Sequence, residues 1–176
     1  MKTIIMRSII IAALASIFSC RGERWDDDLT LPKQDYTGNQ LRVDGYYYSI
    51  TSNNNYQIFF YYRNGCVLEA GVVEADNLAA SEQSYMNGTF YNAVKNYKHD
   101  WGRFTIEGAM IKDELWKPNT GPLEAYTSEG QILNDTTFKM TKSWRSCKPK
   151  KVREFEETYH FKQLSPKPDS TNTFTN

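Results

Sequence analysis

Short runs of β-branched and aromatic residues, separated by turn residues, recur along the chain between residues 41 and 164. The run 56–62 is followed by Asn64-Gly65, and the run 101–106 is followed by Glu107-Gly108. Runs of this kind fit the pleated, half-buried surface of a sheet. Asn-Gly between two of them is a strong signal for a tight hairpin. The pattern therefore predicts an all-β domain of about eight or nine short, hairpin-connected strands.

The turns also predict how the strands pair. Pairing outward from Asn64-Gly65 sets Tyr62 against Val67, and pairing outward from Glu107-Gly108 sets Phe104 against Ile111. A further turn is expected at residues 129–130, where Gly follows Glu. Along 153–164 apolar residues alternate with polar ones, which predicts a last strand with one dry face.

One segment breaks the alternation, because residues 81–100 carry apolar residues at helical spacing. We expect one short helix there, inserted between two groups of strands. An antiparallel sheet of this size must protect its edges, and closure into a barrel does so completely. We therefore predict an antiparallel barrel of eight to nine strands, with a β-sandwich as the alternative.

Three stretches carry a resemblance to a known family. They are "LRVDGYYY" (41–48), "GRFTIEGAMI" (102–111) and "SEGQILNDTTFKM" (128–140). The first resembles the opening strand of lipocalin-like (calycin-type) barrels, with Tyr47 where their Gly-x-Trp motif has Trp. The strand-turn-strand units are similar to those of lipocalin-like lipoproteins of Bacteroidota. The resemblance implies a barrel able to hold something small and apolar, although a fold alone does not establish a function.

The first twenty residues have the organisation of a secretory signal. Lys2 and Arg7 precede an apolar run that is too short to cross a bilayer permanently. The run ends in Ile17-Phe18-Ser19-Cys20, which resembles a bacterial lipobox. The resemblance implies cleavage before Cys20 and acylation of that cysteine with several chains, palmitate among them, which anchors a protein stably. An ordinary signal peptide with a chance cysteine is the alternative.

We divide the chain accordingly. Residues 1–19 are the lipoprotein signal peptide, 20–40 the acylated cysteine with a flexible acidic tether, 41–164 the barrel and 165–176 a disordered tail. The expected location is the outer membrane of a bacterial cell, with the protein held by its lipid. The aspartates 26–28 resemble surface-export signals of Bacteroidota lipoproteins, so surface exposure and a periplasmic orientation both stay open.

Composition and motifs argue against several classes of function. The chain has 21 basic and 21 acidic residues, so it lacks the positive field of a nucleic-acid-binding protein. It has only two histidines, His99 and His160, and no nucleophile elbow or phosphate loop. No Cys or His pair has metal-ligand spacing. We therefore expect neither catalysis nor a cofactor nor a metal.

Two functions fit the pattern. The first is binding of a small apolar ligand inside the barrel. Glu157 shares a strand face with Tyr159, so it either orients a ligand or returns to water at a strand end. The residues expected to bind are Phe59, Tyr61, Phe104, Ile106, Glu157 and Tyr159.

The second function is docking of an envelope protein or glycan through the outer face or through a basic corner. This corner consists of Arg145, Lys148, Lys150, Lys151 and Arg153. A solvated turn whose lysines suppress edge pairing is the simpler interpretation of the same residues.

Two cysteines remain besides the lipobox cysteine. In the oxidising envelope Cys66 and Cys147 could form a disulfide, and two separate thiols are equally compatible with the sequence.

Overall fold

The computed structural model describes residues 25–175, so the expected signal peptide and Cys20 lie outside the described residues. The strands are β1 (Gly45–Ile50), β2 (Tyr56–Tyr61), β3 (Cys66–Val73), β4 (Trp101–Glu107), β5 (Met110–Lys117), β6 (Glu124–Asn134), β7 (Thr137–Arg145) and β8 (Arg153–Gln163). The helical elements are η1 (Ala75–Asn77), α1 (Leu78–Met86), α2 (Thr89–Val94) and η2 (Lys98–Asp100).

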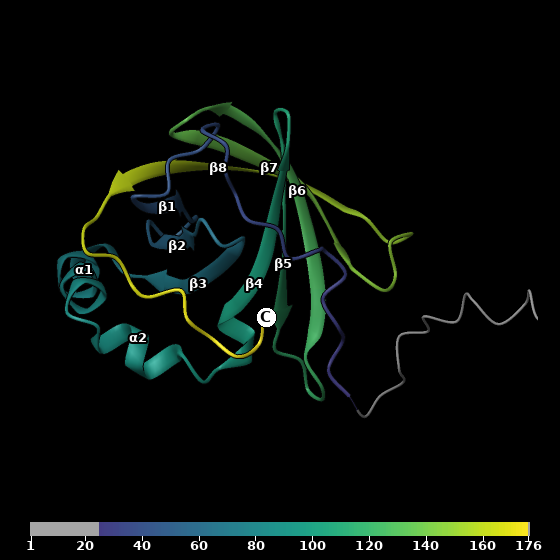
Figure 1. Cartoon of the computed structure of the whole chain (residues 1–176), viewed down its shortest axis with the longest axis horizontal. Helices are drawn as coiled ribbons and strands as arrows, with labels where there is room; N and C mark the ends of the chain where they lie inside the picture. The colour runs from purple at the N-terminus through teal and green to yellow at the C-terminus, as the bar shows by residue number, and fades with distance from the viewer. Residues whose placement is uncertain (1–24, 176) are drawn as a thin grey trace, which may run out of the picture.

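The eight strands form a closed antiparallel barrel in chain order (Figure 1). Closure comes from β1 and β8, which pair from Gly45 opposite Gln163 to Tyr48 opposite His160. A side chain at Gly45 would place its Cβ 2.1 Å from the Lys162 carbonyl oxygen, so glycine is required where the two strands meet. The barrel expectation is confirmed, and the sandwich alternative is wrong because the sheet has no free edge.

The first two predicted hairpin turns lie within one residue of their expected positions, but both pairings differ from the predicted ones. Tyr61, not Tyr62, lies opposite Val67, and Gly65 in the turn between them has a φ of 76°. Phe104 lies opposite Asp113, because the second turn is centred on Gly108-Ala109. This shift puts Asp113 inside the barrel.

The turn expected at residues 129–130 is wrong. β6 continues through it, and a bulge between Glu129 and Gly130 takes up the irregularity. A Cβ at Gly130 would lie 2.1 Å from the Lys139 carbonyl oxygen, so this glycine serves close strand contact. The helical segment is confirmed in position, as two short helices in place of one.

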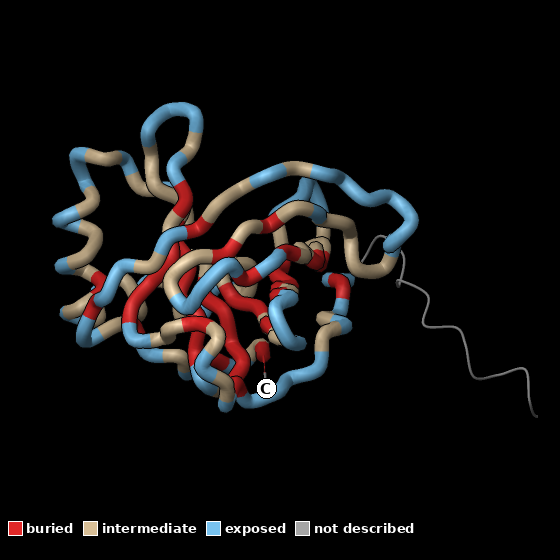
Figure 2. Tube along the Cα trace, turned by 90° about the horizontal axis from the view of Figure 1, so that it is seen from above, coloured by how far each residue is buried: buried red, intermediate tan, exposed pale blue. Residues whose placement is uncertain are grey.

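Aromatic side chains fill the barrel toward the end formed by the β2–β3, β4–β5 and β6–β7 turns, here called the closed end. Tyr47 packs against Tyr61 and Phe138, at ring-centroid distances of 5.8 and 5.1 Å. The Tyr47 hydroxyl donates to the Asp135 carbonyl oxygen at 2.9 Å, which ties the ring to the β6–β7 turn. In Figure 2 buried stretches of the chain, in red, run through the middle of the molecule.

A second apolar layer lies outside the barrel wall. Tyr46 and Phe60 face outward and pack against Tyr85 of α1, with ring centroids 6.5 and 5.2 Å away. This explains why the first hairpin is apolar on both faces. The helical segment and the end of the chain cover its outer face.

Residues 26–41 are not a flexible tether, and here they are called the strap. The backbone N–H of Thr30 and of Leu31 donate to Glu114 Oε2 on the outside of β5, at 2.7 and 2.6 Å. Tyr36 packs edge-on against Phe104, 5.7 Å between ring centroids, and covers the closed end. The polar sequence concealed this order, because hydrogen bonds to the barrel hold much of the strap, and its buried apolar residues Tyr36 and Leu41 follow no periodic pattern.

The expected disordered tail is also wrong for residues 165–175. Lys167 Nζ donates to the Tyr61 carbonyl oxygen at 2.9 Å and lies 4.1 Å from the Tyr62 ring centroid. Thr175 is fully buried, with its Oγ1 3.0 Å from Cys66 Sγ. In Figure 1 this yellow segment passes between the helices and the barrel.

None of the helices among residues 25–175 combines the length and the apolar composition that a membrane-crossing helix needs.

The strap should depend on Glu114. This carboxylate is fully buried and accepts from two backbone N–H groups and from Thr30 Oγ1. Glu114→Ala leaves these donors without a partner, and we expect it to lower the free energy of unfolding by about 3 kcal/mol. Glu156→Ala, at a side chain 73% exposed, should change it by less than about 0.5 kcal/mol. Urea unfolding measures both, and equal losses would contradict this role of the strap.

Candidate functional site

The end of the barrel opposite the closed end opens into a cavity of about 750 Å³. The β5–β6 loop borders it through Pro118 and Asn119, and the first residue of β8, Arg153, lies across the opening. The aromatic residues of the closed half form its floor, so the hollow is a cup and not a channel. Its further lining is Gln57, Phe59, Asp113, Leu115, Lys117, Glu124, Tyr126, Ser128, Met140, Ser143, Phe155, Glu157 and Tyr159.

Asp113 forms part of this floor and is almost fully buried. Its Oδ2 accepts a hydrogen bond from the Tyr61 hydroxyl at 2.9 Å. Burial raises the pKa of this carboxyl from 3.8 to about 6, while hydrogen bonds from Tyr61 and Ser128 and the charge of Lys117 act against the rise. A carboxylate in this position favours a ligand that donates a proton or carries positive charge.

Glu157 points into the same cavity, from β8. It accepts from Ser49 Oγ at 2.6 Å and from the Tyr159 hydroxyl at 2.9 Å. Glu157 is half-buried and lies next to a bulge between β7 and β8. Burial, together with the Glu157 charge, raises the pKa of Tyr159 far above its usual value, so this hydroxyl stays a donor.

The lining combines acidic floor groups with apolar walls. Phe59, Leu115 and Phe155 supply flat apolar surface. Lys117 reaches the opening but forms an ion pair with Glu69, which also accepts a hydrogen bond from Gln57. The cavity thus matches a ligand with an apolar body and a polar, cationic head better than a wholly apolar one.

The structure divides the ligand-binding residues expected from sequence into three groups. Phe59, Glu157 and Tyr159 line the cup together. Tyr61 and Phe104 lie beneath it in the aromatic core, 5.0 Å apart between ring centroids. Ile106 lies away from the cup, in a small hollow that the strap borders near the closed end.

Sequence reasoning missed Asp113, a buried carboxyl of the cup whose pKa is raised by burial. The error in register placed it away from Phe104, and a charged residue in the run "MIKDELW" gives no signal of its own for an inward position. Reading the hairpin with Gly108 as the first turn residue, which its φ of 60° favours, would have placed Asp113 inside.

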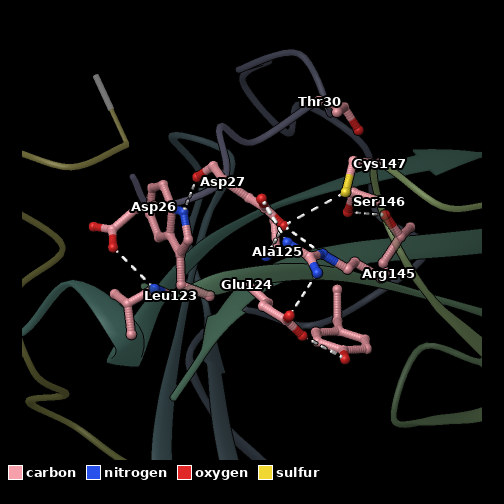
Figure 3. A network of polar contacts seen from close by, with 12 residues as sticks. Asp26, Asp27, Thr30, Leu123, Glu124, Ala125, Arg145, Ser146 and Cys147 are labelled. Atoms are coloured by element: carbon pink, nitrogen blue, oxygen red, sulfur yellow. Dashed lines mark hydrogen bonds and ion pairs between the residues drawn. The ribbon is translucent and has the colours of Figure 1, made fainter. Parts of the chain in front are cut away.

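In the structure, Arg145 of the basic corner differs from the other residues of the corner in its contacts. Arg145 binds Asp27 through Nε and Nη2, at 2.8 and 2.9 Å, and Glu124 through Nη1 at 2.5 Å (Figure 3). It therefore holds the strap. Lys148, Lys150, Lys151 and Arg153 are exposed. All of these except Lys150 line a second hollow with Arg145, and this hollow shares Glu124, Tyr126, Ser143 and Arg153 with the cup.

The acidic run 26–28 contributes to the same contact. Asp26 accepts from the Leu123 N–H at 2.9 Å and pairs with Lys98 at 3.0 Å, and the Trp116 indole donates to the Asp27 carbonyl oxygen at 2.6 Å. Asp27 is buried, whereas Asp26 and Asp28 are exposed. Two of the three aspartates therefore bind the barrel and do not merely solvate a tether.

A disulfide between Cys66 and Cys147, one of the two arrangements that the sequence leaves open, is not formed. Cys66 is a free thiol, buried beside Thr175 under the end of the chain. Cys147 lies on the other side of the barrel, with its sulfur 3.7 Å from Asp27 Oδ2. The two cysteines belong to opposite ends of the barrel, because Cys66 follows the β2–β3 turn at the closed end and Cys147 follows β7 at the open end.

Among residues 25–175 no three His, Cys, Asp or Glu side chains are arranged to hold a metal ion. Comparison with protein-family models gave no matching family, and comparisons with curated proteins and with solved structures gave no similar chain. The class that fold and site define is therefore a closed eight-stranded antiparallel barrel with an acidic-floored cup at one end.

Asp113 should make stability depend on pH. Its folded-state pKa lies above the unfolded value of 3.8, so the folded protein holds the proton more strongly. Stability relative to the Asp113→Asn variant is present below about pH 4 and is lost as the pH rises through about 6. Between pH 4 and pH 7.5, we expect the free energy of unfolding of Asp113→Asn to rise by about 2 to 3 kcal/mol relative to that of the wild type.

Urea unfolding of both proteins at the two pH values gives this difference, in which other titrating groups cancel. An Asp113→Asn difference that stays constant between the two pH values would contradict the burial argument.

Proposed function

We propose that this protein is a lipid-anchored, non-catalytic binding protein of a bacterial envelope, which holds a small amphipathic molecule in its barrel cup. The observation that carries this proposal is the pair of carboxylates in the cup. Within residues 25–175, both Asp113 and Glu157 are hydrogen-bonded by hydroxyl groups, and neither forms an ion pair with a basic side chain. A ligand cation would supply the missing charge.

The size of the cup supports the same proposal. A volume of about 750 Å³ lies within the usual range of small-molecule sites. Apolar side chains line the walls while the acids lie at the floor, so a ligand would enter with its head first. Phe59, Leu115 and Phe155 would then cover its apolar part.

The anchor is the second part of the proposal. The lipobox resemblance at Ile17-Phe18-Ser19-Cys20 supports acylation and an outer-membrane location. The barrel, with Gly45 and Tyr47 at its closing strand, supports a place among lipocalin-like lipoproteins, of the kind found in Bacteroidota. Surface exposure and a periplasmic orientation are both compatible with it.

Docking of an envelope protein or glycan through the whole basic corner has less support. Arg145 already binds Asp27 and Glu124, so a partner would have to displace the strap to reach it. The lysines of the corner stay exposed.

Titration with dodecylamine and with dodecanoate, chosen as probes of equal chain length, tests the cup. We expect dodecylamine to bind at least roughly tenfold more tightly, because it places a cation against the floor. Ser143→Trp should abolish binding by filling the cup, whereas Glu156→Trp, on the outer face of β8, should leave it unchanged. Asp113→Asn with Glu157→Gln should remove the preference for the amine. Equal binding of both probes by the wild type would contradict the acidic floor as the recognition element.

Labelling of growing cells with palmitate tests the anchor. We expect label in the wild-type protein and none after Cys20→Ala, while Cys66→Ala and Cys147→Ala keep the label. A Cys20–Cys147 disulfide in peptides mapped without reduction would contradict acylation, because one sulfur cannot carry both bonds.

A further inference from the structure

The strap begins at the open end of the barrel. The Leu123 N–H donates to Asp26 Oδ1, and the Asp27 N–H donates to the Leu123 carbonyl oxygen, both at 2.9 Å. Leu123 belongs to the β5–β6 loop, which borders the cup. From there the strap runs along β5 and β6 to the closed end, as the purple segment of Figure 1 shows. The chain therefore reaches the barrel at the mouth of the cup.

The connection to the proposed anchor is short. This step depends on acylation at Cys20, as proposed above. Five residues lead from Cys20 to Trp25, and they span at most about 18 Å. The contacts of Asp26 and Asp27 prevent the strap from lengthening this connection. The mouth of the cup, and not the closed end, is therefore the part of the barrel held near the membrane.

The rim of the mouth carries unpaired positive charge. Lys148, Lys150 and Lys151 lie exposed in the β7–β8 loop, and within residues 25–175 no carboxylate forms an ion pair with them. The basic residue before them, Arg145, is neutralised by Asp27 and Glu124. Each exposed lysine near an anionic phospholipid surface adds to attraction.

Exposed apolar side chains lie at the same end. Trp25 is 70% exposed beside the β5–β6 loop, and Val152 is 48% exposed in the lysine-bearing loop. Ile50, 57% exposed, ends β1 at the mouth. Tryptophan is enriched at the boundary between lipid head groups and water.

We propose that this mouth rim, consisting of Trp25, Lys148, Lys150, Lys151 and Val152, rests on the anionic phospholipid surface of the membrane that holds the anchor. The cup then opens toward the bilayer. A ligand with an apolar body would pass between membrane and cup without crossing bulk water.

Lysine acetylation of the acylated protein in vesicles tests this orientation. The vesicles contain phosphatidylglycerol and phosphatidylcholine in equal parts, or phosphatidylcholine alone. With phosphatidylglycerol, we expect labelling of Lys148, Lys150 and Lys151 to fall by roughly fivefold or more relative to detergent, since the head groups bind these amines. Lys112, near the closed end, is the internal control and should be labelled equally in phosphatidylglycerol vesicles and in detergent.

A second measurement uses lipids with brominated tails, which quench tryptophan at the membrane boundary. We expect quenching in the wild type that Trp25→Phe removes. Joint replacement Lys148→Gln, Lys150→Gln and Lys151→Gln should reduce this quenching by roughly half or more. The matched control, Lys112→Gln with Lys139→Gln and Lys162→Gln, removes the same charge from the outer wall and should retain it.

The outcomes separate the two proposals. Acylated protein whose rim lysines label as readily as Lys112 in phosphatidylglycerol vesicles would overturn the orientation and leave the anchor intact. Protein whose N-terminal peptide has no acyl chain by mass spectrometry would overturn the anchor and this orientation together. Quenching that does not depend on the rim lysines would also overturn the rim as the contact surface.

Discussion

Closure of the sheet by β1 against β8 is the constraint on which the rest of the structure depends. Once the barrel is closed, each strand has one face inside and one outside, and the two apolar layers follow. The inner layer fills one half of the barrel with rings, of which Tyr47 and Phe138 are central. The other half keeps smaller or polar side chains such as Ser128 and Ser143, and this difference in volume leaves the cup open.

The sequence predicted what depends on alternation and on turn residues. The barrel, the inward face of β8 with Phe155 and Tyr159, and the helical insertion all follow from local patterns. The sequence-based prediction failed where a shift of one residue in strand pairing decides whether a side chain lies inside or outside the barrel. The turns around Gly65 and Gly108 shifted both hairpin registers, and the second shift hid Asp113. When the turn length is misjudged by one residue, the pairing shifts by one residue, and side chains are assigned to the wrong face of the sheet.

The strap and the end of the chain could not be found from pattern, for a different physical reason. Neither forms a strand or a helix, so neither has a periodic signal. Their order comes from contacts with residues far away in sequence, such as the backbone of Leu31 with Glu114 and the amine of Lys167 with the Tyr61 carbonyl. From sequence alone, polar residues that form such long-range hydrogen bonds cannot be distinguished from polar residues that only keep a segment in water. The acidic run was misread for this reason.

The strap also has a mechanical consequence. It lies along the barrel from mouth to closed end, so a pull at its beginning loads Asp26 and Asp27 before Glu114, and Glu114 before Tyr36. Contacts loaded one after another open at lower force than contacts loaded all at once. A pull on residue 26 would therefore peel the strap from the wall in steps. Each step would release more chain while the sheet itself stays intact.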